Sequence, residues 1–170
     1  LGDGLAGNQW TPVTVSGVTT AIQASAGGPA ATGSHTCATL ASGLIKCWGS
    51  NDLGQLGFPN GFADEATPVT VSGITTATQV SAGGGHSCAR LSSSIVKCWG
   101  DDGQGALGND TAASGTVDSP RTVSGITTAT EAHAGTSHSC ARLSDSSLKC
   151  WGYDFDGEVG NDTAAASQYT

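Results

Sequence analysis

The sequence carries little charge, and very little of that charge is positive. Only 12% of its 170 residues are charged, and six lysines and arginines stand against 14 aspartates and glutamates, for a formal net charge of −8. A surface that binds nucleic acid needs clustered basic residues to displace counterions from the phosphates. We therefore expect no nucleic-acid partner.

Long apolar and long helical segments are also missing. The chain has no methionine, no run of 18 apolar residues and no basic amphipathic stretch, so we expect no membrane insertion. No segment keeps a 3.6-residue period, whereas 26 glycines offer many places to turn. These features favour short strands joined by tight turns.

Motifs of known catalytic sites are absent too. We find no nucleophile elbow, no zinc-protease helix and no phosphate-binding loop. The acidic stretch 154–158 has a weak likeness to a calcium loop but lacks most of its ligands, so ordinary acidic turns are the favoured interpretation. The sequence predicts neither an enzyme nor a bound metal or cofactor.

One segment is present three times. The copies read SHTCATLASGLIKCWG (34–49), HSCARLSSSIVKCWG (86–100) and HSCARLSDSSLKCWG (138–152), and their tryptophans are 51 and 52 residues apart. A period near 50 is typical of repeat architectures. We predict a single repeat array over 1–170, with repeats at about 12–66, 67–118 and 119–170 and with 1–11 as the tail of a preceding repeat phase.

Each copy carries two cysteines ten residues apart. If the two flanking strands form a hairpin, these cysteines face each other at a distance that suits a disulfide. No CxxC occurs, so structural metal and free thiols are the weaker alternatives. We predict an oxidising compartment, secreted or at the cell surface, and three bridges: Cys37–Cys47, Cys88–Cys98 and Cys140–Cys150.

Four short segments rich in Val, Thr and Ile can be strands in each copy. In the second copy they are 67–73, 76–83, 86–92 and 94–100. Four short antiparallel strands at this period describe a propeller blade. The predicted fold is all-β, with β-propeller-type repeats that form about three four-stranded antiparallel blades. Each blade holds one disulfide, in an open array or as part of a larger propeller.

Histidines and tryptophans recur at fixed positions of the repeat, which favours a structural role for both. The histidines precede the first cysteine, and we expect a ring nitrogen to tie one blade to the backbone of the next. The tryptophans follow the second cysteine and are expected to fill the layers between blades. The residues are His35, His86, His138, Trp48, Trp99 and Trp151.

Other candidates lie in the connecting loops. Aromatic residues there are either contact anchors for a partner or plugs between blades: Trp10, Phe58, Phe62, Tyr153, Phe155 and Tyr169. Asn109 and Asn161 begin N-x-[ST] sequons and are candidate glycosylation sites, although a plain Asn-Asp turn is the alternative.

Taken together, the motifs G-x-x-H-[ST]-C-A-x-L, K-C-W-G and N-x-x-G-Q-L-G resemble the repeat of the regulator of chromosome condensation family. The first copy, from Asn51, carries the last motif best; Gln104 is shifted, and Glu158 with Val159 replace Gln and Leu. The resemblance implies a propeller, usually of seven blades. In carrying a cysteine pair in each repeat, the sequence resembles secreted bacterial members of the family more than nuclear members.

The two ends of the sequence have the same phase of the repeat, since Leu1-Gly2 corresponds to Val159-Gly160. We therefore expect repeats that continue covalently or associate head to tail, as a building block of a surface or fibre-like assembly. The alternative is a secreted binding module or inhibitor that grips another protein through its loops. The family includes a nuclear nucleotide-exchange factor, but the acidic balance and the cysteines argue against that role here.

Overall fold

The computed structural model describes residues 2–4, 7–28, 33–59, 61–111 and 115–161. This part of the chain is all-β, and none of it forms a helix that is long and apolar enough to cross a membrane. Its strands are β1 (Ala21–Gly27), β2 (His35–Leu40), β3 (Ile45–Gly49), β4 (Glu65–Thr70), β5 (Ala77–Ala82), β6 (His86–Leu91), β7 (Val96–Asp101), β8 (Thr116–Thr122), β9 (Ala129–Ala134), β10 (His138–Leu143) and β11 (Leu148–Gly152).

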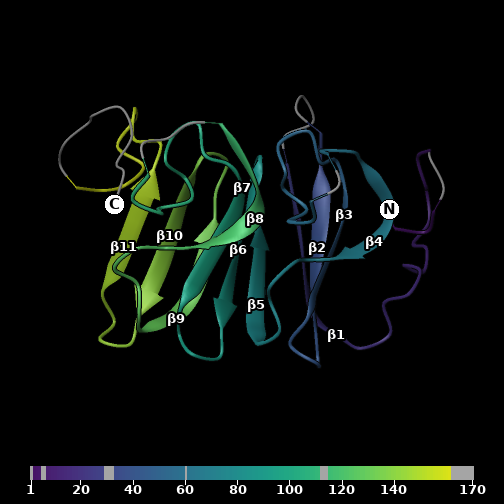
Figure 1. Cartoon of the computed structure of the whole chain (residues 1–170), viewed down its shortest axis with the longest axis horizontal. Coiled ribbons are helices and arrows are strands. Elements are labelled where there is room, and N and C mark those ends of the chain that lie inside the picture. Colours follow the sequence, from purple (N-terminus) through teal and green to yellow (C-terminus); the bar gives the residue numbers. More distant parts are fainter. Residues whose placement is uncertain (1, 5–6, 29–32, 60, 112–114, 162–170) are drawn as a thin grey trace.

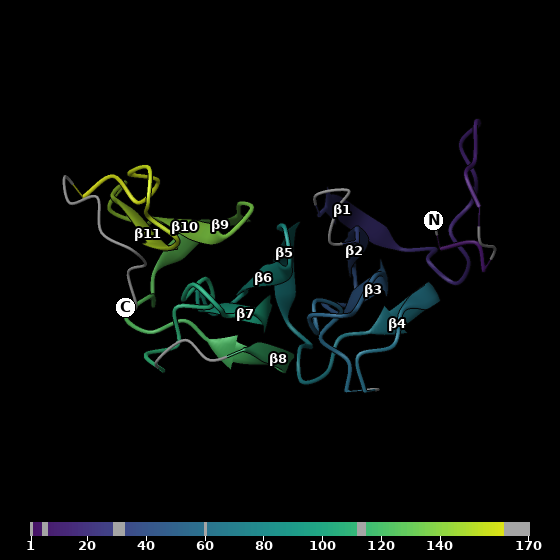
Figure 2. The ribbon, with the colours of Figure 1, turned by 90° about the horizontal axis from the view of Figure 1, so that it is seen from above.

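The strands form three antiparallel sheets that stand side by side along the long axis of the molecule (Figures 1 and 2). The first sheet has the order β1-β2-β3-β4 and the second β5-β6-β7-β8, while the third has β9, β10 and β11 among the described residues. This arrangement confirms propeller-type blades.

Each central hairpin carries its predicted disulfide. Cys37 lies opposite Cys47, and the same pairing recurs in the other two sheets, at Cα–Cα distances of 4.0–4.1 Å. Such short distances belong to the closely spaced pairs of an antiparallel ladder. The three bridges predicted from the spacing are confirmed.

The sheets are offset from the sequence repeat. The segment TPVTVSG at 67–73 begins the predicted second repeat, yet β4 pairs with β3 of the first sheet, with Lys46 opposite Thr70. In the same way β8 pairs with β7. The identical segment TPVTVSG at 11–17 forms no strand.

The apolar core lies between the sheets. One buried cluster joins the first sheet to the second, and another joins the second to the third. The first cluster contains Ile45, Leu56, Val80 and Trp99, and the second contains Val96, Leu107, Ala132 and Trp151. A blade therefore buries its side chains only against a neighbouring blade, as repeat arrays do.

Candidate functional site

The recurring polar residues lie at the junctions between neighbouring sheets, where they bond one sheet to the next. At the first junction, the indole Nε1 of Trp99 and the hydroxyl of Ser87 both donate to the carbonyl oxygen of Gln55, each at 2.9 Å. His35 Nε2 lies 2.8 Å from the same hydroxyl. Because the Ser87 hydrogen goes to the carbonyl, His35 donates through Nε2–H.

The second junction repeats these three bonds at the equivalent positions. Ser139 and Trp151 both donate to the carbonyl oxygen of Ala106 at 2.9 Å, and His86 Nε2 lies 2.9 Å from the Ser139 hydroxyl. Burial lowers the pKa of His35 and of His86 to about 4. Both rings are therefore neutral at pH 7 and serve as donors in a network closed to water.

Two of the three tryptophans, Trp99 and Trp151, lie in the layers between blades, whereas Trp48 of the first sheet lines a cavity beside residues 9–13. Trp99 and Trp151 are fully buried. Their indole nitrogens face Gly57 and Gly108, where an added Cβ would come within 2.7 Å. These glycines have φ values of +65° and +58°. A side chain at either position would meet both backbone strain and the indole.

The inner strands are joined by a second set of bonds. The Gln23 side chain donates to Val80 O and accepts from Val80 N, both at 2.8 Å, and Gln79 Oε1 accepts from Ala132 N at 3.0 Å. Ser25 Oγ accepts from Ala82 N and Ser81 Oγ accepts from Ala134 N, both at 3.0 Å.

In the third sheet the equivalent positions hold Glu131 and His133, both exposed. Glu131 binds Arg142 at 2.7 Å, and this contact lowers the pKa of the Glu131 carboxyl. His133 Nε2 lies 3.9 Å from Glu131. The Gln and Ser side chains that bond the next sheet are therefore replaced in the third sheet by Glu131 and His133, whose contacts stay within that sheet.

The turns that follow the tryptophans are held by one buried side chain in each copy. Asn51, Asp102 and Asp154 are buried and accept the backbone N–H group five residues ahead, at 3.1, 3.2 and 2.9 Å. Burial raises the pKa of the Asp102 carboxyl. Within the described ranges, no three His, Cys, Asp or Glu side chains are grouped so that they could hold a metal ion.

The loop aromatics are spread over the molecule. Trp10 is 92% exposed, Phe155 67% and Phe62 37%, while Phe58 and Tyr153 are partly buried. Only Tyr153 and Phe155 come together among the described residues, as stacked rings with centroids 6.3 Å apart. The remaining candidate, Tyr169, falls outside the described residues.

The sequon asparagines have different surroundings. Asn109 Oδ1 accepts from the backbone N–H and from the hydroxyl of Thr111, at 3.2 and 2.6 Å, and its side chain also bonds Asp102. Asn161 is exposed. Glycosylation at either site stays a prediction.

Sequence reasoning missed the two serines that receive the histidines. Ser87 and Ser139 each follow a histidine of the repeat, so the histidine of one copy bonds the residue after the histidine of the next. The recurring pair His-Ser was the available signal. The link to the next blade thus runs through a hydroxyl rather than directly to the backbone.

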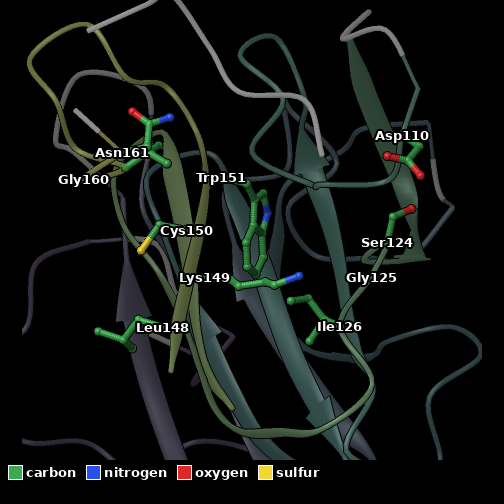
Figure 3. Close-up of a pocket in the computed structure, with 11 residues that line it drawn as sticks. Asp110, Ser124, Gly125, Ile126, Leu148, Lys149, Cys150, Trp151, Gly160 and Asn161 are labelled. Carbon is green, nitrogen blue, oxygen red and sulfur yellow. The ribbon is translucent and has the colours of Figure 1, made fainter. Parts of the chain in front are cut away.

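The third sheet leaves a groove along β11. A cavity of about 500 Å³ lies between β11 and the turn Ser124–Ile126. Figure 3 shows Lys149 and Trp151 pointing from β11 toward that turn, with Leu148 and Cys150 on the opposite side of the strand. Leu148 is 69% exposed, whereas Ile45 and Val96 at its position in the other sheets are fully buried.

Comparisons with known proteins point to one family. Residues 42–90 and 77–106 match models described as regulator of chromosome condensation (RCC1) repeats. The human regulator of chromosome condensation is 32% identical over 129 residues, which cover 75% of this chain and 31% of that protein. The Drosophila melanogaster protein is 32% identical over 124 residues, covering 72% and 22%.

Solved structures agree on the fold. Prp20p from Saccharomyces cerevisiae, described with its binding properties to Gsp1p and histones, has a TM-score of 0.70 at 18% identity and covers 80% of this chain and 35% of Prp20p. Human WBSCR16 scores 0.67 at 20% identity, covering 79% and 35%. The ectodomain of the Arabidopsis thaliana receptor kinase ACR4 scores 0.51 at 22%, covering 79% and 44%. The chain thus spans about a third or less of the length of the human and Drosophila relatives, and under half of each of these structures.

Proposed function

Because this chain is built from repeats of the regulator of chromosome condensation type, we propose that it is a non-catalytic extracellular interaction module. It acts as a building block of a surface or fibre-like assembly, through head-to-tail association or as part of a longer propeller. The observation that carries the proposal is the unfinished junction on each outer sheet.

On the third sheet, His138 holds the position of His35 and His86, and Glu158 holds that of Gln55 and Ala106. On the first sheet, Thr36 and Trp48 hold the positions of the serine and tryptophan that would receive them. Thr36 and Trp48 line a cavity of about 730 Å³ beside residues 9–15. The two outer sheets thus carry the complementary halves of one more junction of the kind that joins the sheets inside the chain.

The extracellular part of the proposal rests on the disulfides. Every cysteine is paired. Bridges of this kind persist in oxidising compartments and are rare where glutathione keeps thiols reduced. The fold is compatible with that setting, since a structure with the same fold is the ectodomain of a plant receptor kinase.

A second candidate function is a secreted binding module or inhibitor that grips a specific partner through its loops. The exposed Phe155, stacked on Tyr153, favours it, because aromatic side chains on loops are typical anchors of protein interfaces. Prp20p, which has the same fold, is described with its binding properties to Gsp1p and histones.

Purification of the native protein under non-reducing conditions tests both candidates. The assembly function predicts recovery from the extracellular fraction, six blocked cysteines by thiol alkylation and mass spectrometry, and complexes that contain only this protein. One stoichiometric foreign protein, lost in a Phe155→Ser variant and kept in an Ile22→Ser control at an exposed apolar residue of β1, supports the loop-binding function. Recovery from the cell interior with alkylatable thiols would contradict an extracellular role.

A further inference from the structure

We propose that the open edge of β11 binds residues 9–15 of a second copy of this chain as the fourth strand of the third sheet. The inference rests on the proposed assembly function and specifies its contact. Among the described residues, β11 pairs only with β10, whereas the equivalent strands β3 and β7 each pair on both sides.

The edge of β11 presents a backbone acceptor to a partner strand. In an antiparallel ladder, alternate residues direct their N–H and C=O groups to opposite neighbours. Since Val71 N and Val123 N donate to Ile45 O and Val96 O at 2.9 Å, Leu148 O is the acceptor at the same position of β11. Exposed, regular strand edges of this kind pair readily with another strand.

The groove also lacks apolar cover. Cys140 and Cys150 are only partly buried, whereas the cysteines of the other two disulfides are at most 1% exposed. In the first sheet, Val69 of β4 lies opposite Cys47 and packs against the core beside it. Val13 opposite Cys150 would pack beside the third disulfide in the same way. The rest of the cover in the first two sheets comes from the next sheet, where Ser87 Oγ lies 3.8 Å from Cys37 Sγ and Ser139 Oγ 3.6 Å from Cys88 Sγ.

The chain itself contains the matching strand. The segment 11–17 has the same sequence as 67–73, which supplies β4, and it forms no strand of its own. Residues 11–14 are exposed. The register of β4 and β8 then places Thr14 opposite Lys149, Val13 opposite Cys150 and Gln9 opposite Gly152.

The proline of this segment fits that register. In β4 and β8 the ladder shifts register between Cys47 and Gly49 and between Cys98 and Gly100, where the partner strands carry Pro68 and Pro120. A proline has no N–H to donate, and an edge strand or a bulge tolerates it. Pro12 of the second copy would occupy the same irregular place.

The extent of the contact is limited by the repeat phase. Gly2 lies against Trp48, and Gly160 has the phase of Gly2. Only one of these turns can lie on a given Trp48. The junction proposed above needs Trp48 to face Glu158 O, so Gly160 of the first copy takes the place of Gly2 on the Trp48 of the second copy, and the intermolecular pairing covers residues 9–15.

A fluorescent synthetic peptide of residues 9–17 is the probe, titrated into the 170-residue chain under non-reducing conditions. N-methylation of Val15 removes the N–H expected to donate to Leu148 O, and the loss of that bond should weaken binding by about tenfold. N-methylation of Thr14 is the matched control, because its N–H points away from β11, and it should change affinity by less than about twofold. Equal weakening by both, or no binding of the unmodified peptide, would overturn the strand-pairing site.

The mass of the chain in solution tests the occupant. Sedimentation should show a mass that rises with concentration, and that falls when the unmodified peptide, but not the N-methyl-Val15 peptide, is in excess. A chain that stays monomeric while the peptide binds would rule out a second copy as the occupant. Assembly that persists in the presence of the peptide would overturn this contact and leave the proposed assembly function standing on another one.

Discussion

Removal of the Ser87 hydroxyl by Ser87→Ala tests the first junction directly. The side chain is fully buried, and its oxygen receives His35 and donates to Gln55 O. The substitution leaves His35 Nε2–H buried without an acceptor, which costs about 1–3 kcal/mol, and deletes a net-favourable bond of about 1 kcal/mol. Because Gln55 O keeps its bond from Trp99, we expect the free energy of unfolding to fall by about 2–4 kcal/mol.

Urea unfolding of the oxidised protein, followed by tryptophan fluorescence, measures this loss. Thr36 occupies the same position in the first sheet but lies beside a cavity instead of a neighbouring sheet, so Thr36→Ala should cost less than about 0.5 kcal/mol. A double-mutant cycle with His35→Phe should give a coupling of at least about 1 kcal/mol. A loss for Ser87→Ala no larger than that for Thr36→Ala, or a coupling near zero, would refute the network.

Burial and backbone geometry lead to three further predictions. Limited reduction, monitored by alkylation and mass spectrometry, should open Cys140–Cys150 first, because only this bridge is partly exposed; simultaneous opening of all three would contradict it. The pKa of His35 and His86 is about 4 in the folded chain against an ordinary 6.5, so the unfolded chain binds more protons between these values and stability falls as the pH drops from 6.5 to 4. Each histidine contributes up to about 1.4 kcal/mol per pH unit to this fall. A His35→Phe variant keeps only the contribution of His86, so its urea midpoint should fall about half as steeply with pH. Ser146 has a φ of +70° where the first hairpin has Gly43 at +80°, and Ser146→Gly should therefore raise the thermal midpoint through a gain of up to about 1 kcal/mol, whereas Gly43→Ser should lower it.

The hairpins and their disulfides could be predicted because the necessary information is local. Cysteines ten residues apart on two strands joined by a tight turn leave one sensible register, and the structure has that register. The outer strand of each sheet is different. The segment 67–73 lies closer in sequence to β5 than to β3, yet it pairs with β3 across the loop 50–64. Nothing in the letters TPVTVSG indicates which neighbour it will join.

The candidate site was predicted in outline but not in its atoms. Recurrence of the histidines and tryptophans indicated a role between blades, and His35, His86, Trp99 and Trp151 do lie there. Which atom receives each histidine depends on how two sheets pack, and a single sequence does not contain that packing. For the same reason Asp102 and Asp154 could not be told apart from exposed acidic turn residues, although both are buried supports of their turns.

The group at the centre of each junction is a main-chain carbonyl, and mutation cannot remove it. The residues that supply this position are Gln55, Ala106 and Glu158, an amide, a methyl group and a carboxylate. The first two make the same pair of bonds although their side chains have nothing in common. A gene encoding such a repeat can therefore be duplicated and then diverge at this position, and the new copy will still be able to dock on its neighbour.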